Sequence, residues 1–266
     1  MLKLPWMSSA DMRRWRTATT LTDLGSLTAS WLLGDIASQA GYTPNCGPDE
    51  ETGPLVPILV AVNRLGFLTD DSQPGCEATG TGGEKWLQRA AVTGLVDDTV
   101  LAGRLTAAAE EAGLLVLNRQ LAFDGNLDGI VVTQVDGKDY TTYGRPMTPE
   151  ALRVTWPERI IGRTAFTRVT QAWQLTLVDP EWGPSGRLWE VLASVVRRYR
   201  LDAVEQKART ARAALCPEYL RRHYAFPDLA RTAVAQLHGT ALDDAIAAAK
   251  LSGCTDDEIE LVTQAS

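Results

Sequence analysis

The chain has 266 residues, 45% of them apolar, which is enough for a sizeable core in one large domain or in a domain with an appendage. A formal net charge of -7 and a pI near 5.0 argue against nucleic acid as a partner, because binding to phosphates requires a local excess of Lys and Arg. No apolar run approaches the roughly 20 residues that span a bilayer, and the N-terminal segment lacks the apolar stretch of a signal peptide. We therefore expect a cytoplasmic protein without membrane contact.

The cysteines and histidines give little support for a metal or catalytic site. The four cysteines form no Cys-x-x-Cys pair, and the two histidines, His223 and His238, are too few for a zinc site or a persuasive His-based triad. The chain also lacks G-x-S-x-G, Walker A and H-E-x-x-H motifs, so hydrolysis and phosphoryl transfer have little support. We expect no metal and no tightly bound cofactor. The basic segment 197–222 is interpreted as solvated helix faces rather than a nucleic-acid patch.

Taken in chain order, the first two elements are predicted to be helices. Residues 19–36 carry apolar side chains at helical spacing, which predicts an amphipathic helix with Thr22 or Asp23 as its N-cap. Residues 52–65 predict a second helix that Thr52 caps, because an apolar run leads to a glycine just past its end.

Strands and helices then alternate. A strand is expected to begin at residues 67–69, and the chain is expected to turn away within the Gly- and Thr-rich stretch 76–83. Residues 86–92 and 114–118 predict two further strands, on either side of a helix over residues 97–112.

The strongest short hairpin signal in the chain is Asp136-Gly137, which lies between two β-rich runs. Residues 174–178 predict another strand, and residues 186–200 predict a helix with one apolar face.

Strand signals disappear from about residue 203, and Ala-rich helical stretches dominate from there on. These patterns predict an α/β fold, with mixed sheets and surrounding helices, over residues 1–202, and an α-helical C-terminal appendage over residues 203–266. The end of the appendage has the helix, Gly-containing turn and helix pattern of a DNA-binding module. Its second helix is acidic, however, which favours a structural helical hairpin.

The segment LTDDSQPG, residues 68–75, places hydroxyl and carboxylate groups at the end of an apolar strand, where small ligands collect in folds of this kind. Thr69 and Ser72 each supply a donor and two acceptors, and Glu51 and Asp71 can accept from ribose hydroxyls or face a cationic centre. These residue types suit a polar ligand with a sugar and a positive charge. Two alternatives remain open: the segment merely forms a turn, or strand alternation puts the two hydroxyls on opposite faces.

A longer stretch, ETGPLVPILVAVNRLGFLTDDSQP at residues 51–74, resembles the C-terminal regulatory domain of eukaryotic methylenetetrahydrofolate reductase in one ungapped frame. The matching signature is Glu-Thr, a helix ending Val-Asn-Arg-x-Gly, and then Leu-Thr-x-x-Ser-Gln-Pro. Weaker matches follow in the same order, including a Gly-Gly and a Gln-Arg-Ala within residues 82–90 and a Val-Thr-Trp at 154–156. Together they cover roughly residues 20–200, a collinearity that a lone motif would not give.

The resemblance implies an α/β domain that binds S-adenosylmethionine and S-adenosylhomocysteine as a regulatory sensor. It does not extend to the family's catalytic barrel and flavin site, so it implies no reductase activity. A second family threonine corresponds to Thr164 if an intervening loop is shorter here. The ligand contacts that the resemblance implies are then Glu51, Thr52, Thr69, Ser72, Thr155 and Thr164.

Three functions remain in competition. The leading hypothesis is a stand-alone binding protein for an adenosyl metabolite, S-adenosylmethionine, S-adenosylhomocysteine or a related nucleoside, which acts as a sensor or sequestering module. The first alternative is an enzyme, a transferase, lyase or hydrolase, that acts on such a metabolite with Glu51 or Asp71 as general base. The second alternative is a protein-interaction module with a vestigial pocket, in which the helical appendage binds a protein partner or a second copy of the chain.

Overall fold

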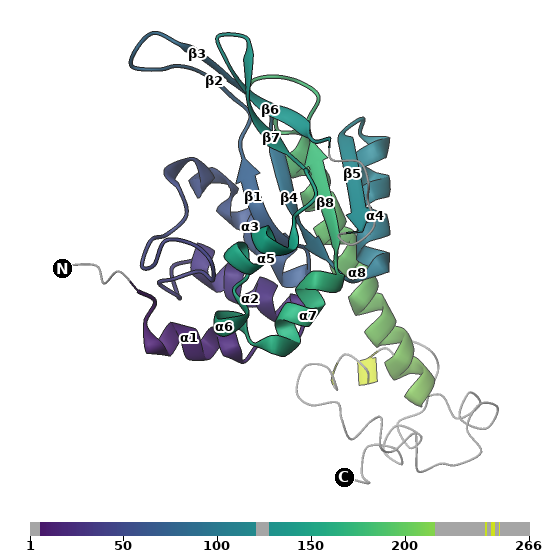
Figure 1. The fold of residues 1–266 in the computed structure, drawn as a ribbon. Helices are drawn as coiled ribbons and strands as arrows, with labels where there is room; N and C mark the ends of the chain where they lie inside the picture. Colours follow the sequence, from purple (N-terminus) through teal and green to yellow (C-terminus); the bar gives the residue numbers. More distant parts are fainter. Residues whose placement is uncertain (1–5, 121–127, 216–242, 244–245, 248–249, 251–266) are drawn as a thin grey trace. The chain divides into compact units, whose positions relative to one another are not determined.

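The computed structural model describes residues 6–120, 128–215, 243, 246, 247 and 250 (Figure 1). The chain divides into two compact units, residues 1–196 and 197–266. In the part of the chain that the structure describes, no helix combines the length and the apolar character that crossing a bilayer requires. The helical hairpin predicted at the end of the chain lies outside the described residues.

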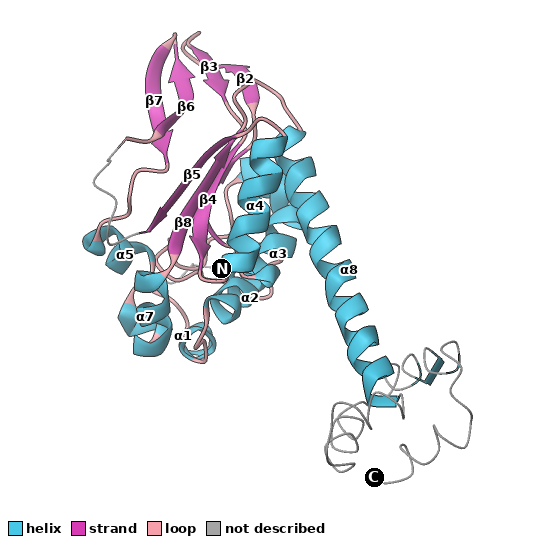
Figure 2. Ribbon diagram, turned by 90° about the vertical axis from the view of Figure 1, so that its right-hand side faces the viewer, coloured by secondary structure: helices cyan, strands magenta, loops and turns pink. Residues whose placement is uncertain are grey.

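The first unit contains two antiparallel sheets of four strands each (Figures 1 and 2). In the first sheet the strand order is β1-β4-β8-β5, and in the second it is β2-β3-β6-β7. Together with the surrounding helices, the two sheets confirm the predicted α/β class. The strands are β1 (Leu68–Gln73), β2 (Cys76–Thr79), β3 (Lys85–Gln88), β4 (Ala91–Val96), β5 (Leu115–Gln120), β6 (Ile130–Val135), β7 (Lys138–Tyr143) and β8 (Trp173–Val178).

The helices surround the first sheet. α2 and α3 pack against each other and against β1, at the edge of the sheet, while α4 packs against β4 and β5 (Figure 2). The helices are α1 (Ser9–Arg16), α2 (Leu21–Leu32), the 3-10 helix η1 (Glu50–Leu55), α3 (Val56–Leu65), α4 (Thr99–Glu111), α5 (Pro149–Thr155), α6 (Glu158–Ile161), α7 (Arg163–Gln171) and α8 (Arg187–Leu215).

One apolar core joins the N-terminal helices to α5, α6 and α7 at one end of the first sheet (Figure 1). Trp15 and Trp156 are fully buried there, with their ring centroids 6.4 Å apart, and Leu68 of β1 and Leu95 of β4 face the same cluster. Burial of large aromatic side chains makes this core a main contribution to stability. It fixes α2 and the loop that follows it beside β1.

The ends of several elements are determined by the backbone angles and hydrogen bonds of the residues at those ends. Asp136 and Gly137 both have positive φ angles, as a two-residue β6–β7 hairpin requires. Gly66 ends α3 in the left-handed conformation, and the side chain of Asp98 caps α4 by accepting from Val100 and Leu101. The interactions of an N-cap or of a C-terminal glycine involve residues only a few positions apart. Such caps can therefore be recognised from the sequence alone.

Two predicted boundaries at the helices are wrong. α2 begins after Thr20, which forms a capping box with Asp23, so neither Thr22 nor Asp23 is the N-cap. Thr52 does not cap α3, because residues 50–55 form a 3-10 helix and α3 begins only at Val56. The positive end of a long helix therefore does not lie at Thr52.

Two strand predictions also change. Residues 86–92, expected as one strand, belong to β3 and β4, because Arg89 and Ala90 carry the chain from the second sheet to the first. Arg89 N donates to Val132 O of β6, while Ala90 O accepts from Asp179 N, so the crossing is hydrogen bonded on both sides. The stretch 76–83 is partly regular: it forms β2 and the tight turn of the β2–β3 hairpin.

Candidate functional site

The polar residues 69–72 were expected at the end of an apolar strand, but they lie within β1, which contains a β-bulge at Asp70. Thr69 pairs with Gly94 of β4, whereas the next residue in register, opposite Thr93, is Asp71. Asp70 is thus an extra residue in the strand, and Ser72 pairs with Val92. Because Gly94 and Val92 are two residues apart on β4, Thr69 and Ser72 project from the same face of the sheet.

A buried amide holds Thr69 in place. Asn63, fully buried near the end of α3, donates from its side-chain nitrogen to Thr69 Oγ1 at 2.6 Å and to Leu59 O at 2.9 Å. Its side-chain oxygen accepts from Thr69 N at 3.1 Å. The Thr69 hydroxyl is therefore fixed as an acceptor for Asn63 and retains its own proton for another partner.

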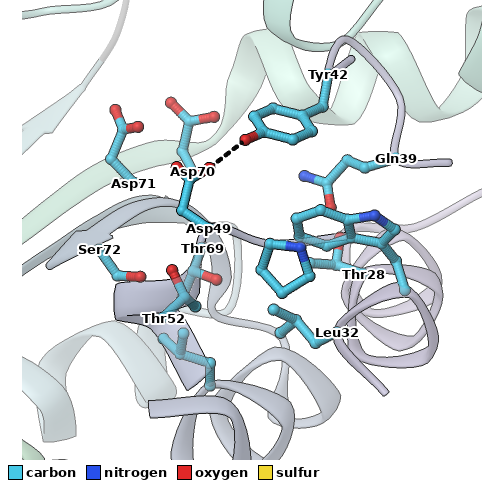
Figure 3. A pocket seen from close by; sticks show the side chains of 13 residues that line it. Thr28, Leu32, Gln39, Tyr42, Asp49, Thr52, Thr69, Asp70, Asp71 and Ser72 are labelled. Atoms are coloured by element: carbon cyan, nitrogen blue, oxygen red, sulfur yellow. Dashed lines mark hydrogen bonds between the residues drawn. The ribbon is translucent and has the colours of Figure 1, made fainter. Parts of the chain in front are cut away.

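A pocket lies between this strand end, η1, α2 and the loop that follows α2 (Figure 3). Its cavity volume is about 110 Å³, and it opens to solvent. Figure 3 shows Thr52, Thr69 and Ser72 on one side, with Gln39 and Thr28 across the pocket from them. The lining residues are Thr28, Trp31, Leu32, Gln39, Tyr42, Pro48, Asp49, Thr52, Leu59, Thr69, Asp70, Asp71 and Ser72.

The loop between α2 and η1 is positioned by hydrogen bonds and one close backbone contact. Trp15 Nε1 donates to Ser38 O at 2.9 Å, and Trp31 Nε1 donates to Cys46 O at 2.9 Å. Gly41, with a φ of 72°, packs so tightly on α5 that a Cβ there would lie 2.0 Å from Thr155 O. These contacts hold Gln39 and Tyr42 at the pocket wall.

Two buried polar atoms of the pocket wall have no hydrogen-bond partner among the residues that the structure describes. They are Thr28 Oγ1, on a side chain with 2% exposure, and Gln39 Oε1, on a side chain with 7% exposure. A threonine hydroxyl inside a helix usually bonds a carbonyl one turn back, and Thr28 does not. Since an unsatisfied buried polar atom costs about 1–3 kcal/mol, this pair indicates a place for a polar ligand.

The charges at the pocket are negative. Asp49, Asp70 and Asp71 line it, and among the described residues no Lys, Arg or His does. Burial, together with the neighbouring charge of Asp71, raises the pKa of Asp70 to about 7, and burial also raises the pKa of Asp71. Tyr42 Oη donates to Asp49 Oδ1 at 2.9 Å, and burial with this bond raises the pKa of the phenol, which stays neutral.

Further groups extend this acidic region beyond the pocket. Tyr143, at the end of β7, has a raised pKa because it is buried and feels the charges of Asp71, Glu51 and Asp70. The pKa of the Cys76 thiol is likewise raised by burial and by Glu51. Within the described residues, no group of three or more His, Cys, Asp or Glu side chains is placed to hold a metal ion.

Three of the six predicted ligand residues meet in this pocket: Thr52, Thr69 and Ser72. Glu51 is exposed and stands outside the lining, although its charge reaches Tyr143. Thr155 ends α5, its backbone lies against Gly41 of the pocket loop, and it is not among the residues that line the pocket. Thr164 is exposed in the first turn of α7 and lies outside the pocket lining.

Sequence reasoning missed the opposite wall of the pocket. Thr28 and Trp31 sit on the helix predicted from residues 19–36, where apolar spacing drew attention to packing and not to a site. Gln39, Tyr42 and Asp49 lie in an irregular loop without a recognisable motif. Only Asp70 had a local signal, since it directly precedes Asp71 at the polar strand end.

A family model covers most of the first unit. The model, described as a domain of unknown function (DUF6919), matches residues 10–198, which is well over half of the chain and includes every residue that lines the pocket. No curated protein matches the chain. The chain therefore belongs to the DUF6919 family.

Proposed function

We propose that this protein binds a small adenosyl metabolite, S-adenosylmethionine, S-adenosylhomocysteine or a related nucleoside, in the pocket beside β1. It acts as a sensor or a sequestering module. One observation carries the proposal: three hydroxyl residues singled out by a family resemblance, Thr52, Thr69 and Ser72, line the same pocket as the two buried polar atoms that lack a partner.

The lining suits a sugar with a polar extension. Hydroxyls of Thr69 and Ser72 can donate to ring or hydroxyl oxygens, and Gln39 Oε1 can accept from a ligand hydroxyl or amine. Trp31 and Tyr42, with ring centroids 5.6 Å apart, supply an aromatic wall. A polar pocket with a few convergent donors and acceptors beside apolar rings is typical of small-molecule sites.

The size of the pocket limits how much of the ligand is enclosed. A cavity of about 110 Å³ is smaller than the roughly 300–1,000 Å³ of typical ligand sites. In the proposed complex only one group of the ligand is enclosed, and the rest lies at the open mouth, beside Tyr42, whose side chain is 40% exposed.

Titration calorimetry tests the proposal. We expect saturable binding of S-adenosylmethionine or S-adenosylhomocysteine with one site per chain, at least tenfold weaker in Ser72→Ala, whose hydroxyl lines the pocket. Ser26→Ala is the matched control, because Ser26 is exposed on α2 and does not line the pocket. A folded protein that carries no copurified ligand by mass spectrometry and gives no heat or thermal shift with either compound refutes the proposal.

A second candidate function, an enzyme acting on such a metabolite, is favoured by one observation. Asp70 lines the pocket with a pKa of about 7 beside a second carboxylate, Asp71, and a general acid or base works best when its pKa lies near the operating pH. Stoichiometric incubation with radiolabelled S-adenosylmethionine, followed by chromatography, separates the two functions. Conversion that Asp70→Asn abolishes supports a lyase or hydrolase, which need no second substrate other than water, and unchanged ligand after a long incubation excludes both.

A further inference from the structure

We propose that Asp70 and Asp71 form an anionic subsite that selects ligands carrying a permanent positive charge, so that a sulfonium compound binds more tightly than its neutral thioether. This inference rests on the proposed function only for the adenosyl part of the ligand, because it concerns the charge alone. The two aspartates occupy the positions that the Leu-Thr-x-x-Ser-Gln-Pro signature leaves open, so the family resemblance says nothing about them.

The bulge in β1 brings both carboxylates to the pocket. In a regular strand, neighbouring side chains point to opposite faces, and one of two consecutive aspartates would point away from any single site. Here Asp70 is the extra residue between the pairs Thr69–Gly94 and Asp71–Thr93, and both aspartates line the pocket. Figure 3 shows the two carboxylates next to each other, above the Thr69 and Ser72 side chains in this view.

No described group around the pair supplies a compensating positive charge. The walls from α2 and α3 contribute Thr28, Trp31, Leu32 and Leu59, none of which is charged. Among the described residues, the titratable side chains that line the pocket beside the pair are Tyr42 and Asp49, and Tyr143 feels the charges of both aspartates. None of these three can carry a positive charge. A half-buried and an exposed carboxylate in one place repel each other, and a ligand cation reduces that repulsion.

The unpartnered atoms across the pocket point independently to a ligand that donates hydrogen bonds. Gln39 Oε1 is an acceptor only, and both it and Thr28 Oγ1 are more than nine-tenths buried without a partner. A ligand that presents an ammonium or hydroxyl group to this wall satisfies them. An anion would leave Gln39 unsatisfied and would also face the aspartates.

The aromatic pair adds a third favourable contact for a cation. Trp31 and Tyr42 line the pocket, with their ring planes 65° apart. A sulfonium or quaternary ammonium group has no proton to donate, and aromatic faces together with carboxylates are the protein groups that stabilise such a charge. The pocket therefore combines anionic, aromatic and acceptor groups, the set that an organic cation requires.

A two-by-two set of ligands tests the charge separately from the adenosyl group. S-adenosylmethionine has the adenosyl group and a sulfonium, S-adenosylhomocysteine has the adenosyl group and a neutral sulfur, S-methylmethionine has a sulfonium alone, and methionine has neither. We expect calorimetry on the full chain to show S-adenosylmethionine binding at least tenfold more tightly than S-adenosylhomocysteine, and S-methylmethionine more tightly than methionine.

Matched variants assign the preference to the two aspartates. Asp70→Asn and Asp71→Asn keep the side-chain shape and remove the charge, and we expect each to reduce the tenfold preference to about threefold or less while S-adenosylhomocysteine affinity changes little. Glu110→Gln removes an exposed charge on α4, which does not line the pocket, and leaves the preference unchanged. Circular dichroism confirms that each variant is folded before its affinities are compared.

The outcomes separate the two proposals. Equal affinity for S-adenosylmethionine and S-adenosylhomocysteine, or a preference that survives in both aspartate variants, overturns the charge inference and leaves the proposed function standing. Binding of S-methylmethionine without binding of either adenosyl compound overturns the proposed function and supports the charge inference. Silence from all four ligands in a folded protein free of copurified ligand overturns both.

Discussion

Gly25 of α2 packs directly against the backbone of Asn63 of α3: a Cβ built on Gly25 would lie 2.1 Å from the Asn63 carbonyl oxygen. The missing side chain lets the two helices approach closely beside β1. Thr28 is one turn further along α2, and the side chain of Asn63 holds Thr69. The approach of these helices therefore sets the distance between the two walls of the pocket.

Substituting Gly25 tests this contact. We expect Gly25→Ala to lower the free energy of unfolding by about 2–4 kcal/mol, because the added methyl group meets rigid backbone and the helices must separate. Gly103→Ala, in the interior of α4 with open space around it, is the control and gains about 0.5–1 kcal/mol from helix propensity. Urea denaturation measures both values. Equal effects of the two substitutions would contradict the close packing of α2 and α3.

A buried glutamine joins the two sheets at the end of β1. The side-chain nitrogen of Gln73 donates to Arg89 O and Val132 O, both at 2.9 Å, and its oxygen accepts from Thr133 Oγ1 at 3.1 Å. Gln73→Glu removes both donors and places a carboxylate against two carbonyl oxygens. We expect a loss of about 3 kcal/mol in the free energy of unfolding at pH 8.

Gln88→Glu is the matched control for this prediction. Gln88 is partly exposed on β3, and the bond recorded for its side chain is accepted by Oε1, from Cys76 Sγ, which a glutamate retains. Its expected loss is below about 1 kcal/mol. A Gln73→Glu variant as stable as Gln88→Glu in chemical denaturation would show that the Gln73 amide does not hold the sheets together.

Thr28→Val separates stability from binding. Valine has nearly the shape of threonine and removes a buried hydroxyl that lacks a partner, so we expect the unliganded protein to gain about 1 kcal/mol. Binding of the ligand is expected to weaken by about tenfold, because the hydroxyl that the ligand satisfies is gone. Thermal denaturation without ligand and calorimetry with S-adenosylmethionine measure the two effects.

Thr176→Val is the control for the two effects expected of Thr28→Val, the gain in stability and the loss of ligand affinity. Thr176 is as buried as Thr28, but its hydroxyl bonds the Thr93 hydroxyl at 2.7 Å, so the substitution leaves a buried group unpaired. We expect it to cost about 1–3 kcal/mol and to leave ligand affinity unchanged. If Thr28→Val destabilises the protein as much as Thr176→Val does, the Thr28 hydroxyl has a structural partner and no vacancy for a ligand.

Asp70 makes stability depend on pH. Its pKa of about 7 in the folded protein exceeds the ordinary value of 3.8, so between pH 4 and pH 7 the folded state holds a proton that the unfolded chain has released. Its contribution to stability is complete below pH 4 and is lost as pH rises to 7. Asp70→Asn has no carboxyl group at this position and does not undergo this loss. We expect the free energy of unfolding of Asp70→Asn, minus that of wild type, to increase by about 2 kcal/mol from pH 4 to pH 7. This is less than a fully buried carboxyl would give.

Urea denaturation of both proteins at pH 4, 5.5, 7 and 8 gives this difference directly. Asp97→Asn, which removes an exposed carboxylate before α4, serves as the control for the loss of one negative charge. A difference between Asp70→Asn and wild type that stays constant from pH 4 to pH 8 would mean that Asp70 titrates as an ordinary surface carboxyl.

The features that the sequence predicted correctly are those decided by neighbouring residues. Asp136-Gly137 specifies its turn because both residues tolerate positive φ angles, and Gly66 ends α3 for the same reason. The helix expected over residues 97–112 is α4, and its start, which was not predicted, is set by Asp98 through the amides two and three residues further on. A conformational preference that acts within one turn of chain requires no knowledge of the rest of the fold.

Residues 86–92 show where local reasoning ends. Their β-rich composition correctly indicated extended backbone, but Leu87 pairs with Gln134 in the second sheet and Val92 pairs with Leu177 in the first. The break between them is set by partners 47 and 85 residues away in sequence. Pairing across such distances leaves no mark in a short window of sequence.

The candidate site likewise combines features that follow from the local sequence with features that depend on the tertiary structure. The sequence by itself determined that residues 69–72 gather hydroxyls and carboxylates in one extended segment, because residue type is a local property. Only the tertiary structure decided that Thr69 and Ser72 share a face, since the bulge at Asp70 exists through pairing with β4. Thr28 and Gln39 each bury a polar atom without a hydrogen-bond partner, and this arises only when α2 and the loop after it pack beside β1. Whether a side chain finds a partner depends on its surroundings in space and not on its neighbours in sequence.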